Sequence, residues 1–263
     1  MYNKNKSYYN LRKMFDLIIQ AYKKSENRIL FLDYDGTLVS YTKMPSEANI
    51  GEDTFAILEQ LSMDLKNSIF IISGRDMGFL ERQFTGLNVN LIAEHGFRIK
   101  EIKKSWVILP NLSLKWKEDF KKFFQGFVSM MPGSFIEEKE ASIAFHYRNI
   151  DKEVENKTLP FIKEKIKEMM TDKPDLEILD GNKVVEIKKT AYNKGTMAAT
   201  ILKRAPYDFI LAAGDDVTDE TLFRELKNNA FTIKIGSGNT LAKYRIDEPK
   251  KLMTFLSELI NVA

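Results

Sequence analysis

The sequence predicts an α/β protein with a Rossmann-like parallel-sheet core, into which a smaller α+β domain is inserted. Two observations support this fold class. Short, continuous apolar runs alternate with segments of helical periodicity, which is typical of strands buried on both faces of a parallel sheet. The middle third of the chain changes to a pattern of helices and hairpins, which indicates a separate and smaller unit.

The first half of the core is expected to alternate between helices and strands. Helices are predicted over residues 8–23 and 50–66, where apolar side chains recur at helical spacing. Strands are predicted at the short apolar runs Ile29–Leu32, Ile69–Ile72 and Leu91–Ala93. Polar residues or glycine follow each run at once, so each strand is expected to end there.

The inserted domain is expected to comprise residues 108–189, and the core residues 1–107 and 190–263. Its elements follow in the order helix, hairpin, helix, hairpin, over residues 113–130, 134–138 with 142–147, 151–171, and 176–179 with 183–187. The first helix has aromatic residues at helical spacing, which predicts a buried face. Pro160 marks either the start of the second helix or a kink in it.

Two linkers, near residues 105–110 and 188–192, are expected to join the insert to the core. An insert held by two linkers is expected to act as a hinge unit that closes over an active site. The second hairpin is expected to turn at Asp180–Asn182, where glycine follows aspartate.

The core resumes after the insert, with a predicted helix over residues 193–204 and strands at Phe209–Ala213 and Phe231–Ile233. Polar residues cluster where predicted strands end, at Asp33–Thr37, Ser73–Arg75, Glu94–Gly96 and Gly214–Glu220. The carboxyl ends of parallel strands meet at one edge of the sheet, and ligands bind there. We therefore expect these clusters to form one site.

The composition excludes several classes of protein. The 263 residues are 44% hydrophobic and 29% charged, which is ordinary for a folded protein and rules out a disordered, collagenous or coiled-coil chain. The net charge of only +3 gives no case for nucleic acid or an anionic membrane as a partner. The absence of cysteine removes disulfides and thiol catalysis, and two histidines are too few for a histidine-built metal site.

The location expected from the sequence is cytoplasmic. The N-terminus is basic, but the apolar segment of a signal peptide does not follow it. No apolar run approaches the roughly 18 residues that are needed to span a bilayer. The absence of cysteine also fits a reducing compartment.

The segment Asp33–Leu38 carries the strongest chemical signal. Asp33 and Asp35 leave the end of a buried strand, where a carboxylate is desolvated unless it has a partner. Mg²⁺ is such a partner, because it prefers carboxylates and completes its octahedron with phosphate and water oxygens. Asp33 would attack phosphorus to form an aspartyl-phosphate, and Asp35 would act as general acid and then as base. Gly36 lets the chain turn close to the phosphate, and Thr37 is expected to cap the next turn.

Three further segments complete the predicted site. Gly214–Glu220 supplies more carboxylates for Mg²⁺, and its Thr218 and Asp219 also suit the N-terminus of a helix. The Ser73 hydroxyl and the neighbouring backbone N–H groups suit a phosphate oxygen. Lys194 opens a predicted helix, where a cation is unfavourable unless an anion lies beside it.

Taken in order, Asp33–Leu38, Ser73, Lys194 and Gly214–Glu220 resemble the motifs of the haloacid dehalogenase (HAD) superfamily of aspartate-nucleophile phosphotransferases. The insert between Ser73 and Lys194 is similar in placement to the C2-type cap of that superfamily. The resemblance implies a HAD core, a cap that determines specificity, and Mg²⁺ as cofactor.

Within that superfamily, the chain resembles the trehalose-6-phosphate phosphatases over nearly all residues from Arg28 onward. The matching segments are Leu32–Leu38, Ser73–Arg75, Ala93–Gly96, Glu137–Lys139, His146–Arg148, Val185–Lys188, Asn193–Gly195, Gly214–Asp216 and Thr218–Glu220. Tyr34, Glu94–Gly96 and His146–Arg148 separate this family from generic relatives. The resemblance implies Mg²⁺-dependent hydrolysis of trehalose 6-phosphate to trehalose and phosphate.

The resemblance also implies roles for individual residues. Asp33 would be the nucleophile, and Asp35 the acid and base. The metal would be held by Asp33, the Asp35 carbonyl and Asp215, with Asp216 and Asp219 nearby. The phosphate group would be bound by Ser73, Gly74 and Lys194. The rest of the substrate would be bound by Arg75, His95, Glu137, Lys139, Arg148 and Glu186.

Several alternatives stay open at this point. Glu137 and Lys139 could form an exposed ion pair, and Arg148 and Glu186 could form a salt bridge within the insert. The substrate could be another sugar phosphate, such as sucrose 6-phosphate or mannosyl-3-phosphoglycerate. The chain could also be a phosphomutase or an inactive module that binds trehalose 6-phosphate. Because no glycosyltransferase domain accompanies the motifs, any trehalose-6-phosphate synthase is expected to be a separate chain.

Overall fold

The structure is a computed structural model that describes residues 2–42, 44–108 and 114–260. It divides the chain into a core unit, Met1–Ile108 with Asn193–Ala263, and an inserted unit, Leu109–Tyr192. The sequence places the two boundaries after residues 107 and 189. Residues 109 and 110 of the first expected linker lie outside the described residues.

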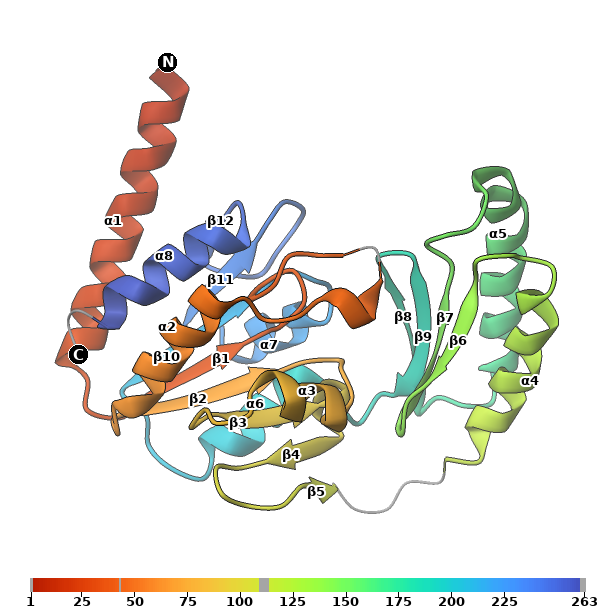
Figure 1. Cartoon of the computed structure of the whole chain (residues 1–263), viewed down its shortest axis with the longest axis horizontal. Helices are drawn as coiled ribbons and strands as arrows, with labels where there is room; N and C mark the ends of the chain where they lie inside the picture. The colour runs from red at the N-terminus through yellow and green to blue at the C-terminus, as the bar shows by residue number, and fades with distance from the viewer. Residues whose placement is uncertain (1, 43, 109–113, 261–263) are drawn as a thin grey trace. The chain divides into compact units, whose positions relative to one another are not determined.

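The core unit contains an eight-stranded sheet in the order β12-β11-β10-β1-β2-β3-β4-β5 (Figure 1). Its strands are β1 (Arg28–Leu32), β2 (Asn67–Ile72), β3 (Asn90–Ala93), β4 (Arg98–Lys100), β5 (Val107–Ile108), β10 (Phe209–Gly214), β11 (Phe231–Ile235) and β12 (Tyr244–Ile246). All pairings from β12 to β3 are parallel, whereas β4 and β5 are antiparallel. The predicted α/β fold class is confirmed, with an antiparallel edge that the sequence analysis does not include.

Strand β1 lies at the point where the strand order reverses. The chain builds outward from β1 through β2 and β3 on one side, and through β10, β11 and β12 on the other. All five residues of β1 are buried, as expected for a strand covered on both faces. In an open α/β sheet, such a reversal creates a crevice beyond the carboxyl ends of the strands. Here Asp33 directly follows β1, and Asp215 directly follows β10.

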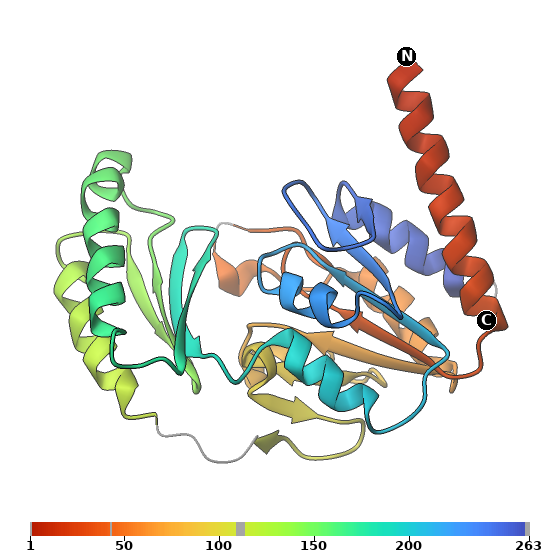
Figure 2. The same ribbon diagram turned by 180° about the vertical axis from the view of Figure 1, so that it is seen from behind.

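Helices cover both faces of this sheet (Figures 1 and 2). They are α1 (Tyr2–Lys24), α2 (Glu52–Met63), α3 (Met77–Gln83), α6 (Lys194–Leu202), α7 (Asp219–Glu225) and α8 (Pro249–Ile260), with short 3₁₀ turns η1 (Pro45–Glu47) and η2 (Glu94–Gly96). Helices α2, α3 and α8 lie over the face seen in Figure 1, and α6 and α7 lie over the opposite face seen in Figure 2. The first helix starts six residues earlier than the predicted range of 8–23 and packs Phe15 on Phe255 of α8, with ring centroids 4.8 Å apart.

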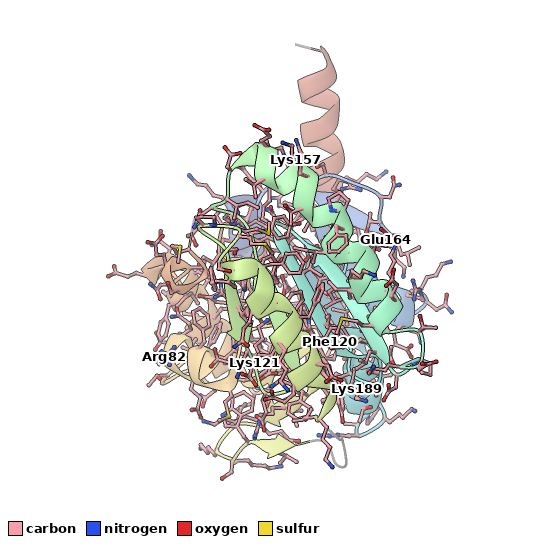
Figure 3. All side chains as sticks on the ribbon, turned by 90° about the vertical axis from the view of Figure 1, so that its right-hand side faces the viewer. Arg82, Phe120, Lys121, Lys157, Glu164 and Lys189 are labelled. Carbon is pink, nitrogen blue, oxygen red and sulfur yellow. The ribbon has the colours of Figure 1, made fainter. Side chains whose placement is uncertain are left out.

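The inserted unit is a four-stranded antiparallel sheet in the order β6-β7-β9-β8, with helices α4 and α5 packed on one face (Figures 1 and 3). Its elements are α4 (Trp116–Val128), β6 (Phe135–Glu138), β7 (Ser142–His146), α5 (Lys152–Met169), β8 (Leu176–Gly181) and β9 (Val184–Lys189). Phe120 and Phe124 of α4 are fully buried, and Phe124 stacks on Phe145 of β7 at 5.2 Å. The predicted buried aromatic face of this helix is therefore confirmed.

Two local expectations for the inserted unit need correction. Pro160 lies inside α5, so it does not begin that helix. The second hairpin turns at residues 182–183 rather than at Asp180–Asn182, because β8 extends to Gly181 and Lys183 takes the left-handed conformation, with φ of 65°.

Within the described part of the chain, no helix combines the length and the apolar character needed to cross a membrane.

Candidate active site

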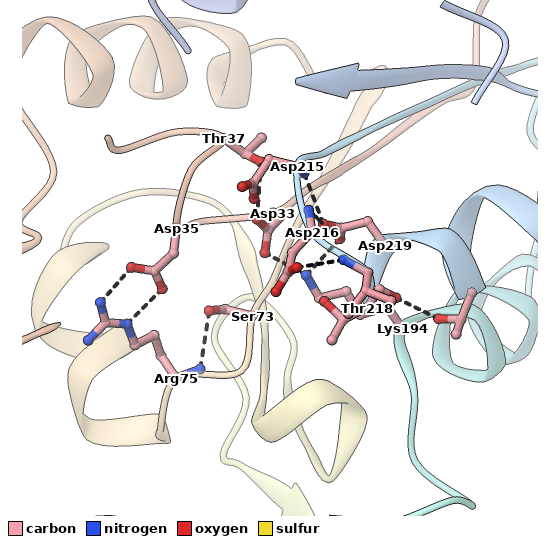
Figure 4. A network of polar contacts seen from close by, with 12 residues as sticks. Asp33, Asp35, Thr37, Ser73, Arg75, Lys194, Asp215, Asp216, Thr218 and Asp219 are labelled. Carbon is pink, nitrogen blue, oxygen red and sulfur yellow. Dashed lines mark hydrogen bonds and ion pairs between the residues drawn. The ribbon is translucent and has the colours of Figure 1, made fainter. Parts of the chain in front are cut away.

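Asp33 is the first residue after β1 and is almost completely buried, with an exposed fraction of 4%. Its backbone N–H donates to the Ala213 carbonyl at 3.0 Å, which ties it to the end of β10. Its Oδ1 accepts from Lys194 Nζ at 2.6 Å, and its Oδ2 accepts from Thr37 Oγ1 at 3.0 Å (Figure 4). Asp33 is thus held rigidly at the carboxyl end of the sheet, beside a buried cation.

Lys194 reaches this position because it is the first residue of α6. Asn193 caps the helix: its side chain accepts from the Thr196 N–H at 2.9 Å, and the Thr196 hydroxyl accepts from the Asn193 N–H. The Lys194 ammonium contacts Asp33 at 2.6 Å and Asp219 at 2.7 Å. In this structure, the anions beside the helix N-terminus are therefore two carboxylates.

Asp219 organises the loop that follows β10. It is fully buried, and its Oδ2 accepts from the N–H groups of Asp215 and Asp216, each at 3.0 Å. A Cβ atom at Gly214 would lie 2.2 Å from the Asp219 carboxyl carbon, so only glycine fits there. Thr218 is the N-cap residue of α7, but its side chain makes no cap hydrogen bond.

Asp215 is held from two directions. Its Oδ2 accepts from the Tyr41 hydroxyl at 2.9 Å, and its Oδ1 lies 3.4 Å from Thr37 Oγ1. Thr37 therefore lies between the carboxylates of Asp33 and Asp215. Contrary to expectation, its hydroxyl does not cap the next turn: it donates to Asp33 Oδ2 and lies 3.4 Å from Asp215 Oδ1. Gly36 has φ of 79°, and a Cβ atom there would lie 2.1 Å from Asp215 Oδ2, so glycine is required for this close approach.

The acidic cluster has strongly perturbed ionisation. Burial, followed by the charge of Asp219, raises the pKa of Asp33 well above its ordinary value, although Lys194 opposes this shift. Burial and the charge of Asp219 raise the pKa of Asp215 to about 6. Burial alone would lower the pKa of Lys194, but the carboxylates of Asp219 and Asp33 raise it, so the lysine stays charged. The single positive charge of Lys194 does not balance the three carboxylates of Asp33, Asp215 and Asp219. Such an excess of buried negative charge favours the binding of a cation.

The donor atoms fit a hard divalent cation. Asp33, Asp215 and Asp219 each have one carboxylate oxygen available as a ligand, and these three oxygens lie within 4.8 Å of one another. An all-carboxylate donor set suits Mg²⁺ better than a softer metal. The family resemblance implies that Asp33, the Asp35 main-chain carbonyl and Asp215 are the metal ligands. The side chain of Asp35 is not needed for this role, and it contacts Arg75 instead.

Asp35 forms a two-pronged ion pair with Arg75. Arg75 Nε donates to Asp35 Oδ2 at 2.7 Å, and its Nη2 donates to Oδ1 at 2.5 Å (Figure 4). The guanidinium also lies over the ring of Phe79, at 4.4 Å from its centroid. The resemblance implies that Arg75 contacts substrate, but in this structure its side chain contacts the expected acid and base.

Ser73, Gly74 and His95 form the neighbouring wall of the site. Ser73 is buried, its Oγ accepts from the Arg75 N–H at 3.2 Å, and its carbonyl accepts from the His95 N–H at 2.9 Å. A Cβ atom at Gly74 would lie 2.5 Å from His95 Nε2. Glu94 and His95 have φ of 47° and 59°, an arrangement that is strained for residues other than glycine. Such strain is typical of functional sites.

Four of the residues predicted to bind substrate, namely Glu137, Lys139, Arg148 and Glu186, lie in the inserted unit. Lys139 pairs with Glu186 at 3.1 Å, and Glu186 also accepts from Ser142 Oγ at 2.5 Å. Lys139 and Glu186 are 10% and 8% exposed, so this salt bridge is buried.

The other two residues of this set contact different groups. Glu137 contacts His146 Nε2 at 2.7 Å, and this contact together with the charge of Lys139 lowers the pKa of Glu137 although partial burial opposes it. Arg148 donates to the Asn182 carbonyl at 2.8 Å. Glu137, Lys139 and Glu186 therefore form a cluster of paired polar side chains on the inserted sheet, and none of the described contacts joins Arg148 to that cluster.

Two residues of the core site are absent from the sequence analysis. Tyr41 contacts the Asp215 carboxylate, and the Lys234 ammonium donates to the Asp215 main-chain carbonyl. For Lys234 the sequence contains a signal, which is a lysine among the apolar residues of strand β11. In the structure this lysine is 5% exposed, and a lysine so buried requires a partner. For Tyr41 the sequence offers no signal, because its contact depends on the path of the segment after Val39.

The chain is similar to known proteins over most of its length. A family model described as trehalose-phosphatase matches residues 31–250. A bifunctional trehalose-6-phosphate synthase/phosphatase of Thermoproteus tenax is 37% identical over 253 residues, which cover 95% of this chain and 34% of the relative. The chain thus spans about a third of the length of the curated relatives that it matches.

The chain is also similar to solved structures. The C-terminal domain of a C. albicans trehalose-6-phosphate phosphatase superposes with a TM-score of 0.88 at 30% identity, covering 95% of this chain and 97% of that domain. A haloacid dehalogenase-like hydrolase from B. subtilis superposes with a TM-score of 0.63 at 13% identity, covering 89% of this chain and 98% of that one, which shows the shared fold alone.

Proposed function

The chain belongs to the trehalose-phosphatase family, and we propose that it hydrolyses trehalose 6-phosphate to trehalose and phosphate with the help of Mg²⁺. The observation that carries this proposal is the extent of the family match. Residues 31–250 include every residue of the acidic site, from Asp33 to Asp219, as well as the whole inserted unit.

Asp33 is the nucleophile in this proposal. One of its oxygens attacks phosphorus, the bond to the sugar oxygen breaks, and the phosphoryl group is transferred to the aspartate. Lys194, at 2.6 Å from Asp33, is well placed to stabilise both the carboxylate and the phosphate oxygens that approach it. Ser73 and the Gly74 N–H would hold a further phosphate oxygen.

Asp33, Asp215 and the Asp35 carbonyl would hold Mg²⁺, with Asp216 and Asp219 behind them. When bound, the cation neutralises phosphate charge as the phosphoryl group is transferred. Asp219 contributes by fixing the backbone of Asp215 and Asp216 through its two N–H contacts. Thr37 contributes by holding the carboxylates of Asp33 and Asp215 on either side of its hydroxyl.

Asp35 donates a proton to the leaving sugar oxygen and then takes one from the water that hydrolyses the aspartyl-phosphate. Arg75 occupies both oxygens of Asp35, so this contact has to loosen before Asp35 can reach the leaving oxygen of the substrate. Arg75 is therefore assigned a role in holding Asp35 as well as in contacting substrate.

The polar cluster of the inserted unit supports a sugar as the rest of the substrate. Glu137, Lys139, Arg148 and Glu186 offer charged groups that can form two hydrogen bonds each with neighbouring hydroxyls. Trehalose 6-phosphate would be supplied by a trehalose-6-phosphate synthase. A cytoplasmic location is also part of the proposal, since the chain has no cysteine.

A panel of sugar phosphates tests the function. Phosphate release from trehalose 6-phosphate, sucrose 6-phosphate and mannosyl-3-phosphoglycerate should be measured with Mg²⁺ and with a chelator in its place. We expect kcat/KM for trehalose 6-phosphate to exceed the others by at least tenfold, on the order of one well-made contact to a sugar hydroxyl. Preference for another substrate would overturn the sugar assignment, and binding without turnover would favour an inactive module.

A further inference from the structure

Tyr41 is a residue of the site with no assigned role. It lies in the segment between β1 and η1, and its side chain is 46% exposed. Its hydroxyl nevertheless donates to Oδ2 of Asp215 at 2.9 Å. An exposed phenol that contacts a half-buried carboxylate of a candidate cation site calls for an explanation.

The two oxygens of Asp215 face different surroundings. Oδ1 lies 3.4 Å from Thr37 Oγ1, which also donates to Asp33 Oδ2, so Oδ1 faces the other carboxylate of the cluster. Oδ2 faces Tyr41. The main chain of Asp215 is fixed as well, because its N–H donates to Asp219 and its carbonyl accepts from Lys234. The carboxylate itself is oriented by the Thr37 hydroxyl, 3.4 Å from Oδ1, and by the Tyr41 hydroxyl, which makes the shorter contact of 2.9 Å with Oδ2.

We propose that Tyr41 is a positioning residue that restricts Asp215 to a single oxygen toward the cation, and that it thereby favours Mg²⁺ over Ca²⁺. The inference rests on the cation site of the proposed function. Mg²⁺ requires a near-ideal octahedron of single oxygens, whereas Ca²⁺ accepts six to eight oxygens and binds a carboxylate through both of its oxygens. Because Tyr41 holds Oδ2, Asp215 can offer a single oxygen, as Mg²⁺ requires, and not both oxygens, as Ca²⁺ accepts.

The substitution Tyr41→Phe tests this by removing one hydroxyl and keeping the ring. Binding of Mg²⁺ and of Ca²⁺ to the metal-free full chain should be measured by calorimetry. Loss of a contact that orients a metal ligand weakens binding by about 10- to 100-fold. We therefore expect Mg²⁺ to bind about tenfold more weakly, Ca²⁺ to bind at least as tightly as before, and the preference for Mg²⁺ to fall accordingly.

Two further variants identify the group responsible. Tyr244→Phe removes a hydroxyl on β12, two strands from β10, and should leave both affinities unchanged. Tyr41→Leu removes the ring as well as the hydroxyl and should reproduce the effect of Tyr41→Phe. Thermal unfolding of each metal-free variant checks that the fold is retained, since a change at a half-exposed ring should affect it little.

Three results would overturn the proposal: equal weakening of both cations, unchanged affinities in Tyr41→Phe, or an effect of Tyr41→Leu that Tyr41→Phe does not share. The failure of the proposed function gives a different result. If the unaltered chain binds neither cation, the cation site itself is wrong and this inference falls with it. If the unaltered chain prefers Mg²⁺ and Tyr41→Phe keeps that preference, only the role of Tyr41 is wrong.

Discussion

Asp33 and Asp35 are two residues apart, yet their carboxylates are held by cations from different elements of the core unit. Lys194 of α6 contacts Asp33, and Arg75, which follows β2, contacts Asp35. The first pair is buried, with side chains 2% and 6% exposed, whereas Arg75 and Asp35 are 14% and 27% exposed. The more exposed pair is the one that substrate can rearrange, which suits a proton donor.

The substitution Asp35→Asn should therefore impair both chemical steps. We expect turnover of trehalose 6-phosphate to fall by about 10²- to 10⁴-fold, because asparagine neither protonates the sugar oxygen nor activates water. With p-nitrophenyl phosphate the leaving group needs no proton, so burst kinetics should show a largely preserved first step. An equal loss of the first step for both substrates would contradict the role of Asp35 as an acid.

For individual residues, the sequence predicts well which of them lie in the same site. It predicts less well which hydrogen-bond or ion-pair partner each of them has. Asp33, Lys194 and Asp215 are expected at one site, and the structure brings them together. The partners of Arg75 and Tyr41 depend on loop conformations and on distances set by tertiary packing. Those contacts leave no trace in residue spacing, so they could not be predicted.

Among the elements, α6 is the one that places Lys194 beside Asp33 and Asp219. The capping box formed by Asn193 and Thr196 fixes where this helix begins and so where the lysine projects.

The substitution Asn193→Ala should lower the free energy of unfolding by about 1 kcal/mol, the typical effect of losing an N-cap. It should also lower kcat, because Lys194 would be less firmly placed beside Asp33. Urea unfolding and steady-state kinetics measure the two effects. Asn229→Ala, at an exposed position outside any helix, is the matched control and should change neither.

The buried pair of Lys139 and Glu186 is important for the stability of the inserted sheet. Glu186→Ala would take one carboxylate from the Lys139 ammonium, which is only 10% exposed and also interacts with the charge of Glu137. Removing one partner of a buried pair costs about 3–5 kcal/mol where the remaining charge is left uncompensated, and Glu137 reduces that cost, so we expect a lowered melting temperature. A variant as stable as the unaltered chain would show that the lysine finds another partner or is hydrated.

Arg148 is the better residue for testing sugar recognition, because its one described contact is the carbonyl of Asn182. Arg148→Ala should reduce kcat/KM for trehalose 6-phosphate by roughly 10²-fold, on the order of a charged hydrogen bond that is fully desolvated. Hydrolysis of p-nitrophenyl phosphate, which has no sugar, should be nearly unchanged. A parallel loss with both substrates would mean that Arg148 has a structural role.

The sequence predicts elements well where they are long or fully apolar. β1 and β10 are recognisable as continuous buried runs, and the aromatic face of α4 follows from its spacing. Helices α3 and α7 have seven residues each, and β12 has three, which is too short for periodicity to be detected. Helix α8 is long enough to be predicted, since its buried residues recur at helical spacing in the sequence, but the sequence analysis does not include it. These residues are Leu252, Phe255, Leu256 and Leu259.

In the whole molecule, the candidate site is assembled from two stretches of chain that the inserted unit separates. Asp33 and Ser73 precede the insert, whereas Lys194 and Asp215 follow it. The parallel sheet brings them together, because β1 lies between β2 and β10. A net charge of +3 over the chain thus coexists with a local concentration of carboxylates.

In the proposed reaction, trehalose 6-phosphate transfers its phosphoryl group to Asp33. This transfer can be tested by quenching the chain with acid during turnover with Mg²⁺ and locating the phosphoryl group by mass spectrometry of proteolytic peptides. We predict a phosphorylated peptide that contains Asp33 and is absent from the nearly isosteric Asp33→Asn variant, which should also lose turnover while keeping its fold. Phosphate release by Asp33→Asn at more than a few per cent of the original rate, or a phosphoryl group at another residue, would contradict the account.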